Sequence, residues 1–148
     1  MNVTIREMQI GDYEQVWKLW MQSKNMGFND RDDSREGIDR LLRRNPGLSF
    51  VAEEEGKIAG VILAGQDGRR GYVYHMCVRE DCRRRGIGAR LARECLSAFR
   101  EQGISKAALL VFKRNGAGNA FWEAQGFSLR EDINYRNIAL TELVRIDT

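Results

Sequence analysis

The sequence predicts an α+β fold in which a mixed, mostly antiparallel sheet is flanked by helices, and three observations lead to this class. Two turn signals, Glu55-Gly56 and Asp67-Gly68, divide residues 48–78 into three short strand-like runs. Segments with helical periodicity lie on both sides of these runs. No linker or repeat interrupts the 148 residues, so residues 1–148 are predicted to form a single domain.

The N-terminal part is predicted to hold one strand and two helices. Val3–Glu7 alternates between apolar and polar residues, as a half-buried strand does. Asp12 is the expected N-cap of the first helix, and Asp33 or Ser34 is the expected N-cap of the second. Asn45-Pro46-Gly47 ends the second helix, because proline cannot continue it.

The remaining elements follow from the same periodicities. The meander is predicted to consist of Leu48–Glu53, Lys57–Ala64 and Gly71–Val78. It is followed by a helix, a strand, a helix and a final hairpin, over Gly86–Glu101, Lys106–Phe112, Asn115–Gln125 and the pair Phe127–Arg130 and Tyr135–Val144. The predicted order is therefore β-α-α-β-β-β-α-β-α-β-β.

The charge is small overall but unevenly placed. The formal net charge is only +3, whereas residues 79–93 carry six arginines and two acids. This basic segment also contains Gly86 and Gly88 and lies between a strand and a helix. A glycine turn that opens a helix is a common anion site, because the first backbone N–H groups of the helix have no internal partner. A charged loop with a glycine cap is the equally simple structural explanation.

Two common phosphate-binding motifs do not fit this segment. A Walker loop would need GxxxxGK[ST], which is absent. A dinucleotide-binding fold would need a third glycine, but Leu91 occupies that position and an antiparallel meander precedes the loop. A zinc site is also disfavoured, because His75 is the single histidine and the cysteines lack paired spacing. We therefore expect no metal.

The segment MCVREDCRRRGIGARL resembles the acetyl-CoA motif of the GNAT superfamily of N-acetyltransferases, in particular its small bacterial single-domain members. A second family segment is similar to VFKRNGAGNAFWEAQGF, at residues 111–127. Two departures stand out: Glu80 occupies the position of the usual proline, and Trp122 that of the usual tyrosine. The resemblance implies a GNAT-like fold and transfer of an acetyl group from acetyl-CoA to a primary amine.

The resemblance also implies where the cofactor would lie. Backbone groups of Met76, Cys77 and Val78 would bind the pantetheine arm, and the strand over residues 106–112 would splay away to admit it. The pyrophosphate would meet the N–H groups of the loop and helix start, with further contacts from nearby side chains. These implied cofactor-binding residues are Arg83, Arg84, Arg85, Gly86, Ile87, Gly88, Ala89, Asn115 and Trp122.

The implied chemistry is direct attack of a neutral amine on the thioester. The N–H near Val78 would stabilise the developing oxyanion. The family's usual strand glutamate is absent from residues 72–78, which makes His75 the candidate base because its ordinary pKa lies near neutrality. Trp122 cannot give up a proton at neutral pH, so Tyr135 is the candidate acid. Each residue also has a purely structural explanation. His75 would be a strand histidine that hydrogen-bonds a backbone carbonyl, and Tyr135 would be a hairpin tyrosine that packs across the strands.

The acceptor is expected to be a small-molecule or protein amine, and a homodimer is left open. Acidic residues in the loop at 28–33 and at Glu131 and Asp132 would suit a cationic amine, although solvated loop charge explains them as well. The polar N-terminus, the lack of a long apolar run and three unpaired cysteines predict a cytoplasmic protein without membrane or nucleic-acid partners.

Three rival functions stay open at this point. The first is a GNAT-fold protein that binds acyl-CoA with little or no transferase activity, which Trp122 and the missing glutamate suggest. The second is an interaction or nucleic-acid module that uses the arginines of residues 79–93. The third is a nucleotide-dependent oxidoreductase, which Leu91 disfavours.

Overall fold

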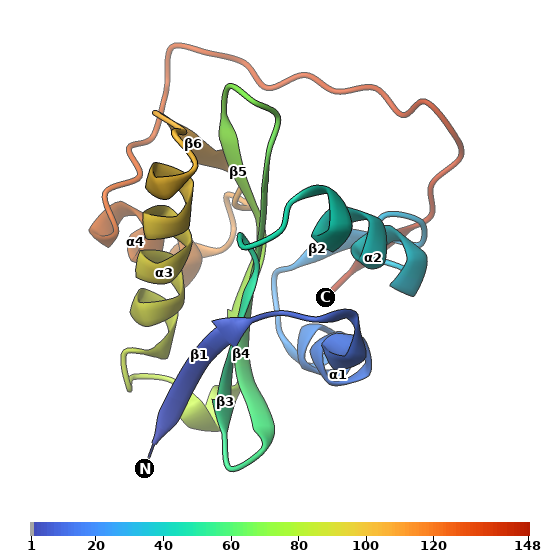
Figure 1. The fold of residues 1–148 in the computed structure, drawn as a ribbon. Helices are drawn as coiled ribbons and strands as arrows, with labels where there is room; N and C mark the ends of the chain where they lie inside the picture. Colours follow the sequence, from blue (N-terminus) through green and yellow to red (C-terminus); the bar gives the residue numbers. More distant parts are fainter. Residues whose placement is uncertain (1) are drawn as a thin grey trace.

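The computed structural model describes residues 2–148, and a twisted five-stranded sheet forms its centre (Figure 1). The sheet order is β1-β3-β4-β5-β6, with bounds Val3–Glu7, Phe50–Glu54, Lys57–Gln66, Gly71–Val78 and Ala107–Leu109. A second sheet pairs β2 (Gly27–Asn29) with β7 (Arg145–Asp147). The helices are α1 (Tyr13–Gln22), α2 (Arg35–Arg44), α3 (Ile87–Glu101) and α4 (Gly116–Ala124), with short 3₁₀ helices η1 (Ile10–Asp12) and η2 (Glu80–Cys82).

The predicted fold class is confirmed. Neighbouring strands are antiparallel from β1 to β5, and β6 alone runs parallel to its neighbour β5. The connection from β5 to β6 passes through α3, as a parallel pair requires, because a tight turn can only join antiparallel strands. The three strands of the predicted meander appear in order, and both turns lie where Glu55-Gly56 and Asp67-Gly68 predicted them.

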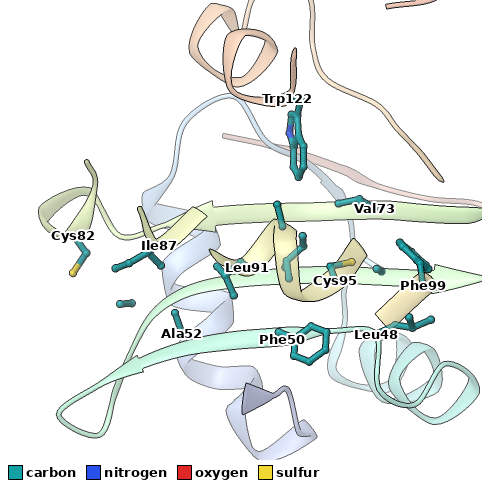
Figure 2. Close-up of a cluster of buried hydrophobic side chains, with 14 residues drawn as sticks. Leu48, Phe50, Ala52, Val73, Cys82, Ile87, Leu91, Cys95, Phe99 and Trp122 are labelled. Atoms are coloured by element: carbon teal, nitrogen blue, oxygen red, sulfur yellow. The ribbon is translucent and has the colours of Figure 1, made fainter. Parts of the chain in front are cut away.

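Two apolar clusters hold the helices against opposite faces of the sheet. One cluster packs α3 and α4 on one face through residues such as Leu91, Cys95, Phe99 and Trp122 (Figure 2). The other packs α1 and α2 on the opposite face and is centred on Trp20. The strand β4 is buried along most of its length because both clusters cover it. Its apolar run is what a strand covered on both faces requires.

The two expected helix caps have different outcomes. Ser34 caps α2, and its Oγ accepts a hydrogen bond from the Gly37 N–H at 3.1 Å. Asp12 makes no side-chain cap to α1, because its carboxylate is already bound to Arg6 and to the Gln9 N–H. Its place at the start of a helix is as predicted, but the carboxylate joins α1 to β1 instead of capping the helix.

The predicted order of elements is wrong at two places. A short strand, β2, lies between α1 and α2, so the observed order is β-α-β-α-β-β-β-α-β-α-β. The final hairpin over Phe127–Arg130 and Tyr135–Val144 does not form. Residues 128–143 instead make no backbone–backbone hydrogen bond within the described chain, and they arc around the sheet before β7 pairs with β2 (Figure 1).

The physical reason is that an alternating pattern favours an extended backbone without supplying a partner for it. Strand β6 ends at Leu109, three residues short of the predicted Phe112, so it offers little edge for a hairpin. The segment is anchored instead at its C-terminal end, where Asp30 Oδ1 accepts a hydrogen bond from the Val144 N–H at 2.8 Å. We call residues 128–144 the connecting strap.

Candidate active site

The two parallel strands at the sheet edge separate part-way along their length. β5 pairs with β6 only through Gly71, Tyr72 and Val73. β5 continues to Val78, while the chain after Leu109 leaves the sheet. The stretch of β5 from residue 74 to 78 therefore has β4 on one side and no strand on the other, as the predicted splaying requires.

The free side of β5 is defined by two hydrogen bonds. The Arg79 N–H donates to the Ala59 carbonyl at 2.7 Å, so residue 79 faces the β4 side. The Val78 carbonyl accepts from Arg83 Nε at 3.1 Å on the opposite side. Because backbone groups alternate along a strand, Met76 and Val78 present theirs to the gap, while Cys77 directs its own toward β4.

The start of α3 provides a set of free backbone donors next to this gap. Gly86 is the N-cap, with φ of 76°, and it has no side-chain cap. The first helical bond runs from the Arg90 N–H to the Gly86 carbonyl at 3.0 Å. The N–H groups of Ile87, Gly88 and Ala89 thus have no partner within the helix. Together with the helix dipole, they favour an anion at this point.

The arginines of this loop have different surroundings. Arg85 forms an ion pair with Glu54 on β3, and Arg83 Nε is bound to the Val78 carbonyl. Arg84 is exposed, has a left-handed backbone with φ of 63°, and makes no side-chain hydrogen bond or ion pair to residues 2–148. Of the three, only Arg84 has a guanidinium wholly free to meet a ligand.

The remaining predicted cofactor residues lie on α4 or face it. A Cβ added at Gly88 would meet the Phe121 ring at 3.2 Å, so the glycine allows α3 and α4 to approach. Asn115 caps α4, and its Oδ1 accepts from the Gly118 N–H at 2.9 Å. Trp122 is 9% exposed and packs in the α3-side cluster against Phe121 and Phe127.

His75 lies at an irregularity of β5. Ile62 of β4 pairs with Met76, and Ala64 pairs with Val73, so one extra β5 residue is accommodated opposite Leu63. Met76 and Val73 contact the α3-side cluster. The bulge brings His75 to the other face, where its ring meets Phe28 and Trp20 edge-on at centroid distances of 4.6 and 5.2 Å.

His75 is bound to an acid that the sequence did not link to it. Its Nε2 lies 2.7 Å from Asp33 Oδ1, and the two side chains are 15% and 7% exposed. Asp33 Oδ2 accepts a second hydrogen bond, from the Asn29 N–H at 2.8 Å. Asp33 was expected as a helix cap or a loop charge. Only the fold brings it to residue 75, which is 42 positions away in the chain.

Tyr135 lies on the connecting strap and is 60% exposed. Its Oη accepts a hydrogen bond from Asn137 Nδ2 at 3.3 Å. On β5, Tyr72 and Tyr74 stack with a centroid distance of 5.6 Å. Burial raises the pKa of both β5 hydroxyls, and the nearby Tyr135 hydroxyl raises it further.

The comparisons with known proteins agree with this geometry. Residues 13–127 match the model of the acetyltransferase (GNAT) family, which is more than half of the chain. This chain belongs to the GNAT family. A similar acetyltransferase from Sodalis glossinidius is 30% identical over 129 residues, which is 87% of this chain and 89% of the relative.

Two solved structures resemble this GNAT chain closely in fold. Ard1 from Thermoplasma volcanium superposes with a TM-score of 0.79 and 26% identity, over 88% of this chain and 85% of that one. The PaiA N-acetyltransferase from Thermoplasma acidophilum, in complex with coenzyme A, gives a TM-score of 0.77 and 18% identity, over 90% and 94% of the two chains.

The cysteines of this GNAT chain are buried and poorly suited to act as nucleophiles. Burial raises the pKa of the Cys77 and Cys95 thiols to about 12, so both are protonated at neutral pH. Within residues 2–148, no three His, Cys, Asp or Glu side chains gather as a metal site would need. No helix of that range is long and apolar enough to cross a membrane.

Proposed function

We propose that this GNAT chain transfers an acetyl group from acetyl-CoA to a primary amine. One observation carries the proposal: the unpaired edge of β5 leads directly to a helix start with three free N–H groups. The pantetheine arm of acetyl-CoA is extended, carries amides and leads to a pyrophosphate. It therefore matches the strand edge and the free N–H groups that follow it. The arm would lie beside Met76 and Val78 as an added strand, and the pyrophosphate would lie at the start of α3.

The cradle at α3 suits a pyrophosphate for two physical reasons. Gly86 has a left-handed backbone, which glycine adopts without strain, and a Cβ placed there would meet no protein atom within 4 Å. The space beside Gly86 where a side chain would lie is therefore open. Arg84 adds a positive charge that no acid of residues 2–148 neutralises, and Arg83 adds a second one close by, whereas the charge of Arg85 is paired with Glu54.

Acetyl-CoA supplies the acetyl thioester, and the chain supplies proton transfer and charge stabilisation. His75 is proposed to take the proton from the acceptor ammonium, since an amine must be neutral to attack a carbonyl. The Val78 N–H is proposed to donate to the carbonyl oxygen as negative charge develops there. The carbonyl of Val78 is already bound to Arg83, which helps to hold this part of the edge in place.

Tyr135 is proposed to protonate the departing thiolate, and Asn115 and Trp122 to shape the cofactor site from α4. Tyr135 is exposed, so this role requires that the strap bring it close to the gap beside β5. Asn115 would act mainly through the α4 N-terminus that it caps, and Trp122 through the packing of α4 against the sheet. The acceptor is proposed to be a small-molecule or protein amine.

A thermal melt of the purified protein tests cofactor binding directly. Coenzyme A and acetyl-CoA at about 100 times their Kd should each add about 2.7 kcal/mol to the free energy of unfolding, which raises Tm by several degrees. NADPH is the control and should give no such shift. If neither coenzyme A species raises Tm, the proposal is wrong. If both do, release of coenzyme A thiol with a panel of primary amines distinguishes a transferase from a protein that only binds acyl-CoA.

A further inference from the structure

The contact between His75 and Asp33 places a proton at a defined atom. Asp33 accepts a hydrogen bond from the Asn29 N–H on Oδ2 and faces His75 Nε2 with Oδ1 at 2.7 Å. An ionised carboxylate can only accept hydrogen bonds. The short contact therefore requires a hydrogen on Nε2, and the neutral imidazole then has its lone pair on Nδ1.

The second ring nitrogen is free. Nδ1 of His75 takes part in no hydrogen bond with residues 2–148. Within the same residues, the only buried side-chain polar atom without a partner is Trp20 Nε1. Since Nδ1 has no partner and is not among the fully buried atoms, it keeps some exposed surface, in a side chain that is 15% exposed overall. Nε2 is thus directed into the protein, and Nδ1 can receive a proton from outside.

His75 also lies where β5 begins to border the gap proposed to hold the acetyl thioester. The pairing of β5 with β6 ends at Val73, so His75 lies at the beginning of the stretch that borders the gap. Its ring packs against Trp20 of α1 and Phe28 of β2, which also contact each other. Asp33 is held in turn, because the Tyr13 hydroxyl donates to its backbone carbonyl at 2.7 Å.

We infer that Asp33 is a positioning residue for acetyl transfer, which fixes the Nε2–H tautomer of His75 and leaves Nδ1 to receive the proton of the acceptor ammonium. The inference rests on the proposed function and adds a residue to it. The N–H bond of the ammonium breaks, its electron pair stays on the amine nitrogen, and the proton forms a bond to Nδ1, directly or through one water. Asp33 stays ionised and stabilises the imidazolium that results.

The variant Asp33→Asn gives a sharp test, because its orientation is determined by Asn29. The Asn29 N–H needs an acceptor, so the amide oxygen of the new residue will face it. The amide NH₂ will then face His75 Nε2 and donate to it. A ring nitrogen that accepts a hydrogen bond carries no proton, so the proton must move to Nδ1. The variant is thus expected to reverse the tautomer while it keeps the shape of the site.

The tautomer can be measured without any substrate, because His75 is the single histidine of the chain. Two-bond ¹H–¹⁵N correlation spectra of the labelled protein distinguish the two neutral forms, and only one imidazole contributes. We expect Nε2–H in the wild type and Nδ1–H in Asp33→Asn. Asp39→Asn is the matched control, since the Asp39 carboxylate pairs with Arg43 of the same helix, α2, and it should keep the wild-type tautomer.

Kinetics then separate a catalytic effect from a structural one. Asp33→Asn should lower kcat about 100-fold, the lower end of what a general base contributes, with the KM for acetyl-CoA and the coenzyme A-induced Tm shift unchanged. The pH dependence of kcat/KM should lose the limb that reports the base. Asp39→Asn should stay within about twofold of the wild type.

Two results would overturn the inference. A wild-type proton on Nδ1 contradicts the positioning role, and this result needs only the wild-type protein. A reversed tautomer with unchanged kcat shows that His75 is not the base and that the pair is structural. Failure of the proposed function itself is seen separately, as the lack of a Tm shift with coenzyme A in the wild type.

Discussion

At the residue scale, the backbone of the phosphate loop carries a conformational cost. Arg84 adopts a left-handed conformation with φ of 63°, although it has a side chain that disfavours this region. A left-handed non-glycine residue at a candidate site indicates that the fold tolerates a less stable backbone there in order to bind a ligand. Glu55, in the turn between β3 and β4, has a similar φ of 51° and lies outside the candidate site.

A comparison of Arg84 with Glu55 tests whether the left-handed backbone at Arg84 is connected with coenzyme A binding. Arg84→Gly and Glu55→Gly should each raise the free energy of unfolding by about 1 kcal/mol, because glycine adopts the left-handed region without strain. Only Arg84→Gly should weaken coenzyme A binding, by about three- to fivefold, as expected for the loss of one exposed charge contact. Denaturant titration and calorimetric binding measure the two effects. Equal affinities of both variants for coenzyme A would remove Arg84 from the site.

At the scale of the element, the connecting strap and α3 differ in how their apolar residues are used. Leu91 of α3 is fully buried in the cluster that joins the helix to the sheet (Figure 2). Leu140 and Ile138 of the strap are 93% and 82% exposed. The sequence contains apolar residues at regular spacing in both elements, but only α3 has a sheet face to cover them.

The difference predicts opposite sensitivities to substitution. Leu91→Ala should lower the free energy of unfolding by about 2–5 kcal/mol, because it leaves a cavity in the core. Leu140→Ser should change that free energy by less than about 0.5 kcal/mol, because the Leu140 side chain is almost fully exposed. Urea unfolding followed by circular dichroism compares the two. A large loss for Leu140→Ser would show that the strap is packed in solution.

At the scale of the whole molecule, two carboxylates join different elements: Asp12 at the start of α1 binds Arg6 of β1, and Glu54 of β3 binds Arg85 in the loop before α3. Burial acts to raise the pKa of Asp12, but the hydrogen bonds from Arg6 and the Gln9 N–H outweigh it and hold the pKa below its usual value. The ion pair with Arg85 lowers the pKa of Glu54. Both groups therefore bind protons less readily in the folded chain than in the unfolded one.

Acid should consequently destabilise the fold. The contribution of both carboxylates is complete above their unfolded pKa of about 4, and it is lost as the pH falls toward their lower folded values. The free energy of unfolding should decrease from about pH 5 to pH 2, and less steeply in the variant with Asp12→Asn and Glu54→Gln. Unfolding curves at several pH values give this slope.

Asp132→Asn is the matched control for the acid experiment. Arg130 holds the pKa of Asp132 at about 2, but the two residues are only two positions apart on the exposed strap. Unfolding need not break so local a contact, so the pH dependence of stability should stay as in the wild type. An equal change of slope in the control would mean that the lowered pKa values do not arise from contacts between elements of the fold.

The sequence by itself determined the α+β class, the meander, the helix start at Gly86 and the family. These features depend on local turn chemistry, periodicity and contiguous motifs, which a linear pattern records. It also indicated His75 as a candidate base, because residues 72–78 contain no glutamate and a histidine has an ordinary pKa near neutrality.

The tertiary structure alone decided the rest. The partnership of His75 with Asp33 depends on a bulge in β5 and on the return of the α1–α2 loop to the sheet, and no spacing between positions 33 and 75 encodes it. The strap was predicted as a hairpin because its residues favour extended backbone, yet pairing needs an edge at the right place in space. Contacts between distant segments are set by the packing of whole elements, which is why local patterns could not supply them.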